Sequence, residues 1–246
     1  MLRKSVFISG ASGDIGYEIA KVFASNNYNI FATYNKGNIS KLKDLSNTYN
    51  VDIFIQQMDL TSSQSIYDAF NKAQKVCEYL DCVVCNAGIS KPEKLLTDTE
   101  EDEITELINT NLTGTILCNK EALKIFLKQK RGSIINISSI YGMYGGSCES
   151  TYSATKAGII GLTKALAQEY GQFGIRINSV SPGFIQTNMT AQFNNEDKKY
   201  IASATPLQRL GNPIDVANTV FFLSTDNASF ITGENIIISG GATNFN

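Results

Sequence analysis

A tyrosine and a lysine four residues apart, Tyr152 and Lys156, are the side chains in this sequence best suited to proton transfer. Four residues make about one helical turn, so both side chains lie on the same face of a helix. A free tyrosine has a pKa near ~10, and a fixed cation beside it favours the phenolate and lowers that pKa. The chain has no histidine among its 246 residues, which excludes a Ser-His-Asp triad and any histidine acid, base or metal ligand.

A glycine-rich segment is the second feature with chemical potential. It reads Gly10-Ala11-Ser12-Gly13-Asp14-Ile15-Gly16 and separates a strand-like run from a helical pattern. Glycines at such a turn let the backbone approach a pyrophosphate, whose charge the helix N-terminus favours. Glycines also form turns that bind nothing, but the position between the first strand and the first helix favours a dinucleotide cofactor.

The end of the second strand bears on which cofactor binds. A fold that binds NAD often carries an acid about twenty residues after the glycine-rich turn, where it holds the ribose 2′-hydroxyl. The sequence here is Thr33-Tyr34-Asn35-Lys36, without a carboxylate. Lys36 offers its charge to a 2′-phosphate, although a lysine after a strand is commonly only solvated. We therefore expect NADPH (NADP+) as the preferred cofactor and NADH as the alternative.

The elements that position these residues alternate along the chain. Runs rich in β-forming residues predict strands at Ser5–Ser9, Asn29–Tyr34, Asp52–Met58, Asp81–Cys85, Ser133–Ser138, Ile175–Ser181 and Asn235–Ser239. Apolar spacing predicts helices at Ser62–Glu78, Glu101–Lys128, Thr151–Tyr170 and Pro213–Ser224, and one between the first two strands. This alternation predicts an α/β fold: one domain over residues 1–246, built on a doubly wound parallel sheet with helices on both faces.

The segment Thr187–Thr205 is the most polar irregular part of the chain. Its composition fits either a solvated surface helix or a mobile lid over a site. The residues alone do not separate these two alternatives.

The five cysteines are Cys77, Cys82, Cys85, Cys118 and Cys148. Cys82 and Cys85 have CxxC spacing, but they stand in an apolar run that predicts a buried strand. Residues three apart on a strand point to opposite faces, and no second pair completes a zinc site. We expect core packing and no metal.

Charge and hydropathy limit the partners and the location. The net charge is −2 and no lysine- or arginine-rich run is present, so we expect neither nucleic acid nor an anionic membrane as a partner. The N-terminus leads directly into a strand, and no apolar stretch approaches the ~20 residues of a membrane span. We expect a cytoplasmic protein.

From about Ser5 to Gly241 the sequence resembles the short-chain dehydrogenase/reductase family. The family motifs occur in family order: the glycine-rich turn, Asp59-Leu60, Asn86-Ala87-Gly88, Asn111, Ser139, Tyr152-x-x-x-Lys156 and Pro182-Gly183-Phe184-Ile185-Gln186-Thr187. The resemblance implies a Rossmann-type fold and a ketone reductase. It also implies a cofactor site formed by Gly10, Ser12, Gly13, Asp14, Ile15, Gly16, Asn35, Lys36, Asp59, Leu60, Asn86, Ala87, Gly88, Tyr152, Lys156, Pro182, Gly183, Ile185 and Thr187.

The resemblance assigns roles to four catalytic residues. Ser139 would bind the substrate carbonyl oxygen, and Tyr152 would protonate it as a hydride arrives from the nicotinamide. Lys156 would lower the pKa of the tyrosine and hold the nicotinamide ribose, while Asn111 would position a water that relays protons to Lys156. Ile185 and Thr187 would hold the carboxamide. Two nearby residues compete for these roles: Ser138 for the serine and Asn109 for the asparagine.

The sequence departs from the family pattern at two positions. Asp14 stands where a glycine is usual; an acid near a helix N-terminus is locally favourable, but it alters phosphate affinity unless it points away. Cys85 replaces the first asparagine of the common Asn-Asn-Ala-Gly, a minor change in packing.

Two groups of ketone reductases within the family are similar to this chain. Over its whole length it resembles bacterial 3-oxoacyl-acyl-carrier-protein reductases of fatty-acid synthesis, which bind their acidic carrier protein through basic residues. Here Phe173 stands at one docking position and Lys130, beside Arg131, at the other. The segments 138–142 and 146–149 instead resemble reductases of a 5-aminopentanone group on elongation factor P. Glu149 would pair with the substrate amine there, or serve only the helix dipole.

We favour the fatty-acid type as the function. A non-catalytic dinucleotide sensor or scaffold is the third hypothesis, and the retention of Tyr152 and Lys156 argues against it. Family members are mostly homotetramers whose interfaces use the helices around Glu101–Lys128 and Thr151–Tyr170. We expect the same here, because small residues in the second helix permit close packing: Ala154, Ala157, Gly158 and Gly161.

Overall fold

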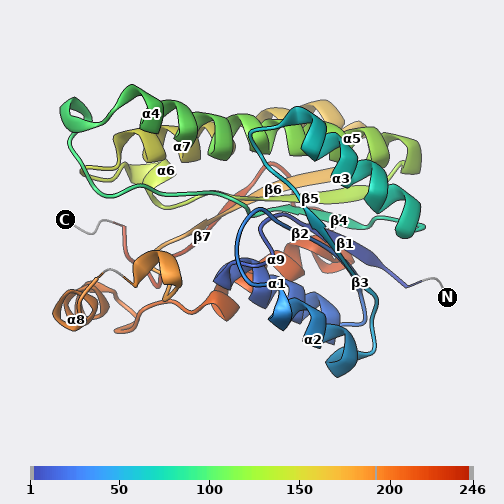
Figure 1. Ribbon diagram of the computed structural model, residues 1–246, viewed down its shortest axis with the longest axis horizontal. Helices are drawn as coiled ribbons and strands as arrows, with labels where there is room; N and C mark the ends of the chain where they lie inside the picture. The colour runs from blue at the N-terminus through green and yellow to red at the C-terminus, as the bar shows by residue number, and fades with distance from the viewer. Residues whose placement is uncertain (1–2, 192, 244–246) are drawn as a thin grey trace.

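A sheet of seven parallel strands forms the centre of the computed structural model, which describes residues 3–191 and 193–243 (Figure 1). The order across the sheet is β3-β2-β1-β4-β5-β6-β7, the order of a doubly wound dinucleotide-binding sheet, with the switch point between β1 and β4. The strands are β1 Ser5–Ile8, β2 Asn29–Tyr34, β3 Ile53–Gln57, β4 Cys82–Cys85, β5 Gly132–Ile137, β6 Ile175–Pro182 and β7 Asn235–Ile238.

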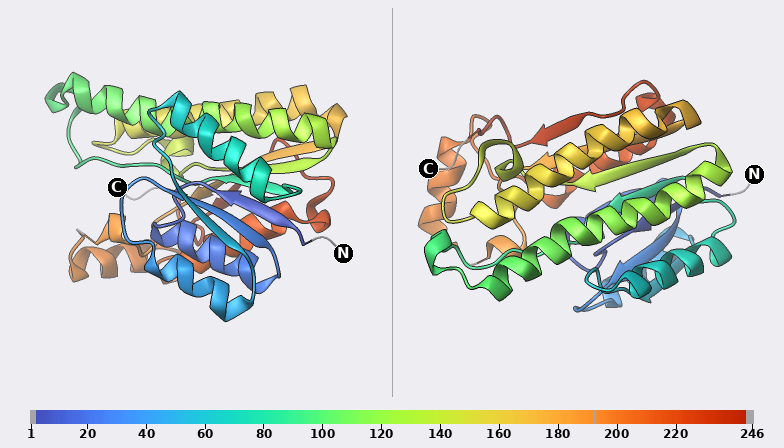
Figure 2. Two further views of the ribbon diagram at one scale, coloured as in Figure 1. Left: turned by 45° about the vertical axis from the view of Figure 1, so that its right-hand side comes forward. Right: turned by 90° about the horizontal axis from the view of Figure 1, so that it is seen from above.

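Helices cover both faces of this sheet. Figure 1 shows α1, α2 and α9 on one face and α3, α4, α5 and α7 on the other, and the turned views of Figure 2 show the same layers. The helices are α1 Asp14–Ser25, α2 Ser40–Tyr49, α3 Ser63–Val76, α4 Glu101–Leu107, α5 Gly114–Gln129, α6 Tyr141–Tyr144, α7 Ser150–Tyr170, α8 Asn195–Ala204 and α9 Pro213–Ser224. The predicted α/β fold with a doubly wound parallel sheet is confirmed.

The core is divided by the sheet because strand side chains alternate between its faces. Ile8 and Cys82 belong to the apolar cluster that contains the buried residues of α1 and α9. Phe7 and Cys85 belong to the cluster on the opposite face, where the Phe7 ring stacks on Phe70 with centroids 4.2 Å apart. The two cysteines of the CxxC spacing are therefore buried on opposite faces, as predicted.

Three helical segments differ from the prediction. The short α6 was not predicted, because four residues are too few to show an apolar period. The single helix expected over Glu101–Lys128 is interrupted by a π-helical turn at Ile108–Thr113, which separates α4 from α5. Helix α2 was not predicted, because only Leu42 and Leu45 of its residues are buried and its apolar pattern is weak.

The polar segment Thr187–Thr205 holds a 3-10 turn at Asn188–Thr190 and the helix α8. The side chain of Asn194 begins α8 by accepting hydrogen bonds from the backbone N–H groups of Glu196 and Asp197, both at 2.8 Å. A surface helix is present, and its movement as a lid stays a prediction. Residue 192 of this segment lies outside the described residues, as do residues 1–2 and 244–246 of the predicted domain.

Within the described ranges, no helix has the combination of length and hydropathy that crossing a bilayer requires.

Candidate active site

The predicted site residues gather at one edge of the sheet because they follow the carboxyl ends of neighbouring parallel strands. The glycine-rich turn follows β1, Asn86 to Gly88 follow β4, Ser139 follows β5, and Ile185 and Thr187 follow β6. The outer edge of a doubly wound sheet at its switch point is where such folds bind ligands.

The glycine-rich turn packs backbone against backbone. Gly10 has a φ of +65°, and a Cβ there would lie 2.8 Å from the Cα of Ala87. A Cβ on Gly16 would lie 2.3 Å from the carbonyl oxygen of Gly10. The amide of Asn86 donates to the carbonyl oxygens of Ser9 at 3.0 Å and of Gly10 at 3.1 Å. The turn after β1 is therefore locked to the loop after β4.

The N-terminus of α1 fits the pyrophosphate of a dinucleotide. Gly13 is the N-cap residue and provides no side-chain cap. The N–H groups of a helix's first turn have no acceptor within the helix. Those of Asp14, Ile15 and Gly16 have no acceptor elsewhere in the described part of the chain, so they can face an anion. Since the helix dipole also favours negative charge there, the residues present suit a phosphate group.

Tyr152 and Lys156 lie on one face of α7, as their spacing predicted. The Lys156 Nζ is 5.5 Å from the centroid of the Tyr152 ring. Among the described residues it donates one hydrogen bond, to the carbonyl oxygen of Ile137 at 3.0 Å, which leaves two of its three donors for a ligand. Lys156 is 4% exposed, and this burial lowers its pKa to about 8.

The pKa of Tyr152 shifts in the opposite direction from the one that the sequence predicted. Burial raises it above its usual value, and the charge of Glu149 adds to the rise, while the hydroxyl of Ser139 lowers it. Desolvation of the phenol is thus stronger than any effect of Lys156. Tyr152 keeps its proton at neutral pH, which suits a proton donor.

The two serines after β5 have different surroundings. Ser138 is buried, and its hydroxyl donates to the carbonyl oxygen of Lys156 in α7 at 2.8 Å. The hydroxyl of Ser139 accepts a hydrogen bond from the N–H of Tyr141 at 3.2 Å. It is also the hydroxyl whose hydrogen bond with Tyr152 lowers the pKa of that phenol. Ser138 therefore connects β5 to α7, and Ser139 is the serine beside the tyrosine, in agreement with the resemblance.

Asn111 lies in the π-helical turn between α4 and α5 and is 1% exposed. Its side chain pairs with the backbone of Ile89: Oδ1 accepts from the N–H and Nδ2 donates to the carbonyl oxygen, both at 2.8 Å. A Cβ on Gly88 would lie 3.2 Å from Asn111 Oδ1 and 3.5 Å from Lys156 Nζ. Both residues thus border Gly88, whereas Asn109 is exposed.

The remaining residues of the predicted cofactor site lie after β2 and β3. Asn35 and Lys36 are exposed, and Lys36 forms no ion pair within residues 3–191 and 193–243. Ser12 donates to the carbonyl oxygen of Lys36 at 3.3 Å, which brings the glycine-rich turn beside this loop. The carboxylate of Asp59 accepts from the N–H of Thr61 at 2.9 Å. Next to it, Leu60 is buried near Gly114.

The residues at the end of β6 and after it are held by close contacts, most of them between backbone segments. Pro182 ends the strand, and a Cβ on Gly183 would lie 2.9 Å from the Cα of Ser239. Ile185 is buried and forms a bridge with Gly211. The N–H of Thr187 donates to the hydroxyl of Thr190 at 3.0 Å.

Asp14, the first departure from the family pattern, points away from the phosphate-binding turn. Its carboxylate accepts hydrogen bonds from the backbone N–H of Asn188 at 2.6 Å and from its side-chain Nδ2 at 3.2 Å. Asn188 was not identified as a site residue from the sequence, because no local pattern indicates a contact between residues so far apart in the sequence.

Glu149 precedes α7 and is half-buried near Tyr152. Burial, and then the charge of Glu93, raises its pKa to about 7. Its carboxylate has no hydrogen bond or ion pair with the part of the chain that the structure describes. Glu93 was also missed, because a separate loop brings it here: the N–H of Lys94 donates to the carbonyl oxygen of Cys148 at 3.1 Å.

Among the described residues no cluster of metal-ligating side chains is present.

Known proteins resemble this chain over nearly its full length. The family model described as enoyl-(acyl carrier protein) reductase matches residues 10–243. The 3-oxoacyl-[acyl-carrier-protein] reductase FabG of Aquifex aeolicus is 38% identical over 240 residues, covering 97% of this chain and 96% of its own. The FabG of Staphylococcus aureus (strain Mu50) is 37% identical over 242 residues, covering 98% of both chains.

Solved structures agree with this relationship. The structure of ElxO with NADP bound has a TM-score of 0.91 and 37% identity, covering 97% of this chain and 98% of its own. The Cj0485 dehydrogenase has a TM-score of 0.91 and 26% identity, covering 99% of this chain and 95% of its own. Together with the motifs at the edge of the sheet, these matches show that the chain belongs to the short-chain dehydrogenase/reductase family of oxidoreductases.

Proposed function

We propose that this protein uses NADPH to reduce a ketone to a secondary alcohol. The observation that carries the proposal is the proximity of Ser139, Tyr152 and Lys156 at the same carboxyl edge of the sheet as the N-terminus of α1. The NADP-bound structure of ElxO supports the choice of cofactor. Lys36, exposed after a strand that ends without a carboxylate, would meet the 2′-phosphate, and NADH remains the alternative.

The residues act on the substrate oxygen. NADPH, when bound, supplies a hydride to the carbonyl carbon. Ser139 donates a hydrogen bond to the carbonyl oxygen, and Tyr152, which carries its proton at neutral pH, gives that proton to the same oxygen. The ammonium of Lys156 stabilises the phenolate that remains, and its two spare donors hold ribose hydroxyls. Asn111, fixed by Ile89, orders the water that returns a proton through Lys156.

A β-ketoacyl thioester on an acyl-carrier protein is the first candidate substrate. The relatives that support it are 3-oxoacyl-[acyl-carrier-protein] reductases at 37–38% identity. An acidic carrier protein would favour a basic docking surface, and the expected docking surface here is only weakly basic. Arg131 pairs with Asp81 at 3.2 Å and lies over the ring of Tyr79, and Phe173 is an exposed apolar residue. Lys130 is the remaining basic residue at these positions.

A ketone that carries an amine, such as a 5-aminopentanone group on elongation factor P, is the second candidate. The observation that favours it is the half-buried carboxylate of Glu149 beside Tyr152, with Glu93 as a second negative charge nearby. A buried carboxylate without a cation is unfavourable, and a substrate ammonium would relieve that cost. The same chemistry would orient the ketone toward the tyrosine.

A side-by-side measurement of NADPH oxidation tests both candidates. The substrates are an acetoacetyl thioester on acyl-carrier protein and an aminopentanone-modified elongation factor P, each with NADPH and with NADH. Glu149→Gln should lower kcat/KM at least about tenfold for the amine substrate and leave the thioester within about twofold, since only the former needs the charge. Equal effects on both substrates would remove Glu149 from substrate recognition. No turnover with either ketone would contradict the proposed activity.

We infer a homotetramer from the surface of α7. Ala154, Ala157 and Gly161 are exposed along one side of this helix, and a Cβ on Gly161 would meet nothing within 4 Å. Exposed Ile116 on the neighbouring α5 adds apolar surface. Gly158 is used within the subunit instead, against Leu112. Light scattering that gives the mass of four chains supports the inference, and a stable monomer contradicts it.

The expected cytoplasmic location stays a prediction.

A further inference from the structure

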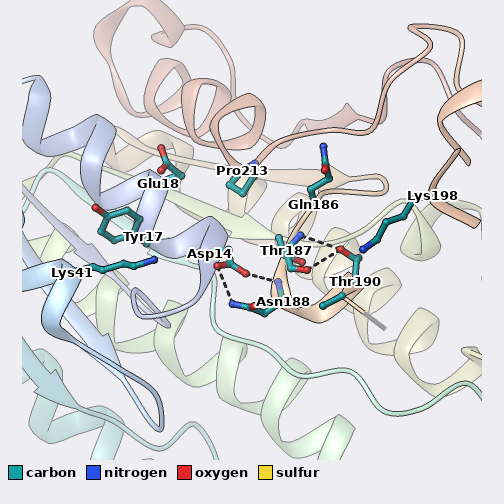
Figure 3. A pocket seen from close by; sticks show the side chains of 11 residues that line it. Asp14, Tyr17, Glu18, Lys41, Gln186, Thr187, Asn188, Thr190, Lys198 and Pro213 are labelled. Carbon is teal, nitrogen blue, oxygen red and sulfur yellow. Dashed lines mark hydrogen bonds between the residues drawn. The ribbon is translucent and has the colours of Figure 1, made fainter. Parts of the chain in front are cut away.

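Asp14 connects two cofactor-site segments that are 174 residues apart in the sequence. It is the first residue of α1, directly after the glycine-rich turn. Its Oδ2 accepts a hydrogen bond from the backbone N–H of Asn188 at 2.6 Å, and its Oδ1 accepts one from Asn188 Nδ2 at 3.2 Å. Figure 3 shows both hydrogen bonds crossing from the helix to the segment after β6.

The segment that Asp14 holds contains the residues proposed to bind the carboxamide. Asn188 begins the 3-10 turn that follows Thr187. Within this turn, the hydroxyl of Thr190 accepts from the N–H of Thr187 at 3.0 Å and lies 2.8 Å from the carbonyl oxygen of Ile185. A displacement of Asn188 would therefore move Thr187 and Ile185 with it.

The charge of Asp14 is satisfied by these amide donors rather than by a cation. Asp14 forms no ion pair with the described residues, although it lines a cavity of about 380 Å³ that Lys41 and Lys198 also border (Figure 3). The Lys41 Nζ lies over the ring of Tyr17, 6.0 Å from its centroid. Hydrogen bonds to a charged acceptor are stronger than neutral ones, so this contact can hold an otherwise exposed turn.

We propose that Asp14 is a positioning residue that latches the 188–190 turn onto the glycine-rich turn, and thereby fixes Ile185 and Thr187 against the cofactor site. The inference rests on the proposed NADPH site. A carboxylate at the N-terminus of α1 would otherwise compete with the pyrophosphate for the same N–H groups. Its engagement with Asn188 removes that competition and gives the acid a structural use where the family pattern has glycine.

Hydrogen exchange in the protein without cofactor tests the latch itself. Asp14→Gly removes both hydrogen bonds, and the backbone amides of 187–190 should exchange about tenfold faster than in the parent protein. Asp14→Asn keeps an acceptor for the N–H of Asn188 and should restore most of the protection. Glu18→Gln is the matched control: it lies one turn along α1, borders the same cavity and pairs with Lys21 at 3.3 Å. It should leave the exchange of 187–190 unchanged.

NADPH binding separates the latch from a simple charge effect. The latch predicts that Asp14→Gly raises the Kd and KM for NADPH about tenfold with kcat within about twofold, and that Asp14→Asn lies close to the parent. Charge repulsion of the pyrophosphate predicts tighter binding in both variants. Unchanged exchange in Asp14→Gly, or tighter NADPH binding, would overturn the proposal. If the parent protein bound no NADPH, the proposed function would fail, while the exchange result would still decide whether the latch exists.

Discussion

Two regions that meet at the carboxyl edge of the sheet are held in different ways. Lys156 and Ser138 are buried, and their hydrogen bonds connect α7 to the end of β5. The 188–190 turn is largely exposed, and its contact with the glycine-rich turn runs through the carboxylate of Asp14. Lys156 is thus fixed by buried hydrogen bonds, whereas the cofactor clamp depends on a few hydrogen bonds near water. Substitutions in the first region should lower kcat most, whereas those in the second should change cofactor affinity and leave kcat nearly unchanged.

Replacement of Lys156 should have the largest effect of the buried region. Lys156→Met keeps an unbranched apolar chain in place but removes the ammonium that stabilises the phenolate and holds the ribose. We expect kcat to fall by about 10³-fold and NADPH to bind more weakly. Steady-state rates and a fluorescence titration with NADPH measure the two effects. Lys164→Met, two turns along α7 at an exposed position, is the control and should change neither. A Lys156→Met enzyme with a tenth of the parent kcat would contradict the role.

Alanine substitutions in the glycine-rich turn test whether the close approach of its backbone segments matters. A Cβ at Gly16 would lie 2.3 Å from the Gly10 oxygen and 2.9 Å from the Ala11 Cα, and backbone atoms cannot easily yield. Gly16→Ala should lower the free energy of unfolding by about 3 kcal/mol and weaken NADPH binding. At Gly13 the nearest atom would be 3.6 Å away, so Gly13→Ala should stay within about 0.5 kcal/mol. Denaturant unfolding compares them, and equal losses would show that close packing does not explain the turn.

Glu149 should have the smallest effect, visible as a pH dependence of stability. Its pKa is raised from 4.5 to about 7 in the folded chain. The stability that the protonated carboxyl group contributes is therefore fully present below about pH 4.5 and is lost as the pH rises through 7. Glu149→Gln should therefore raise Tm by about 3 °C at pH 8 and by much less at pH 5. Glu169→Gln, exposed near the end of α7, should change Tm little at either pH. An equal gain at both pH values would show that the ionised carboxylate is not the cause.

The fold was largely predictable because its signals are local and periodic. The alternating strand and helix patterns, with glycines between β1 and α1, indicated the doubly wound sheet. The π-helical turn at Ile108–Thr113 was not predicted, since an apolar pattern does not distinguish i+4 from i+5 hydrogen bonding. Its polar run Asn109-Thr110-Asn111 was the available signal.

The proximity of the residues proposed as catalytic was predictable, and their environment was less so. Ser139, Tyr152 and Lys156 occupy one cluster, as motif spacing indicated. The direction of the Tyr152 pKa shift was wrong, because spacing reports a nearby cation but not the burial that outweighs it. The contact of Asp14 with Asn188 depends on two turns that meet only in the folded chain.

The central claim is that Tyr152 gives its proton to a ketone in a site that binds NADPH independently of that hydroxyl. Tyr152→Phe removes only the hydroxyl from α7, so the most direct measurement is its NADPH oxidation rate together with its Kd for NADPH. We predict a fall in kcat of about 10³-fold or more, with the Kd within about twofold of the parent. A variant that keeps its turnover, or one that loses NADPH binding along with it, would contradict the account.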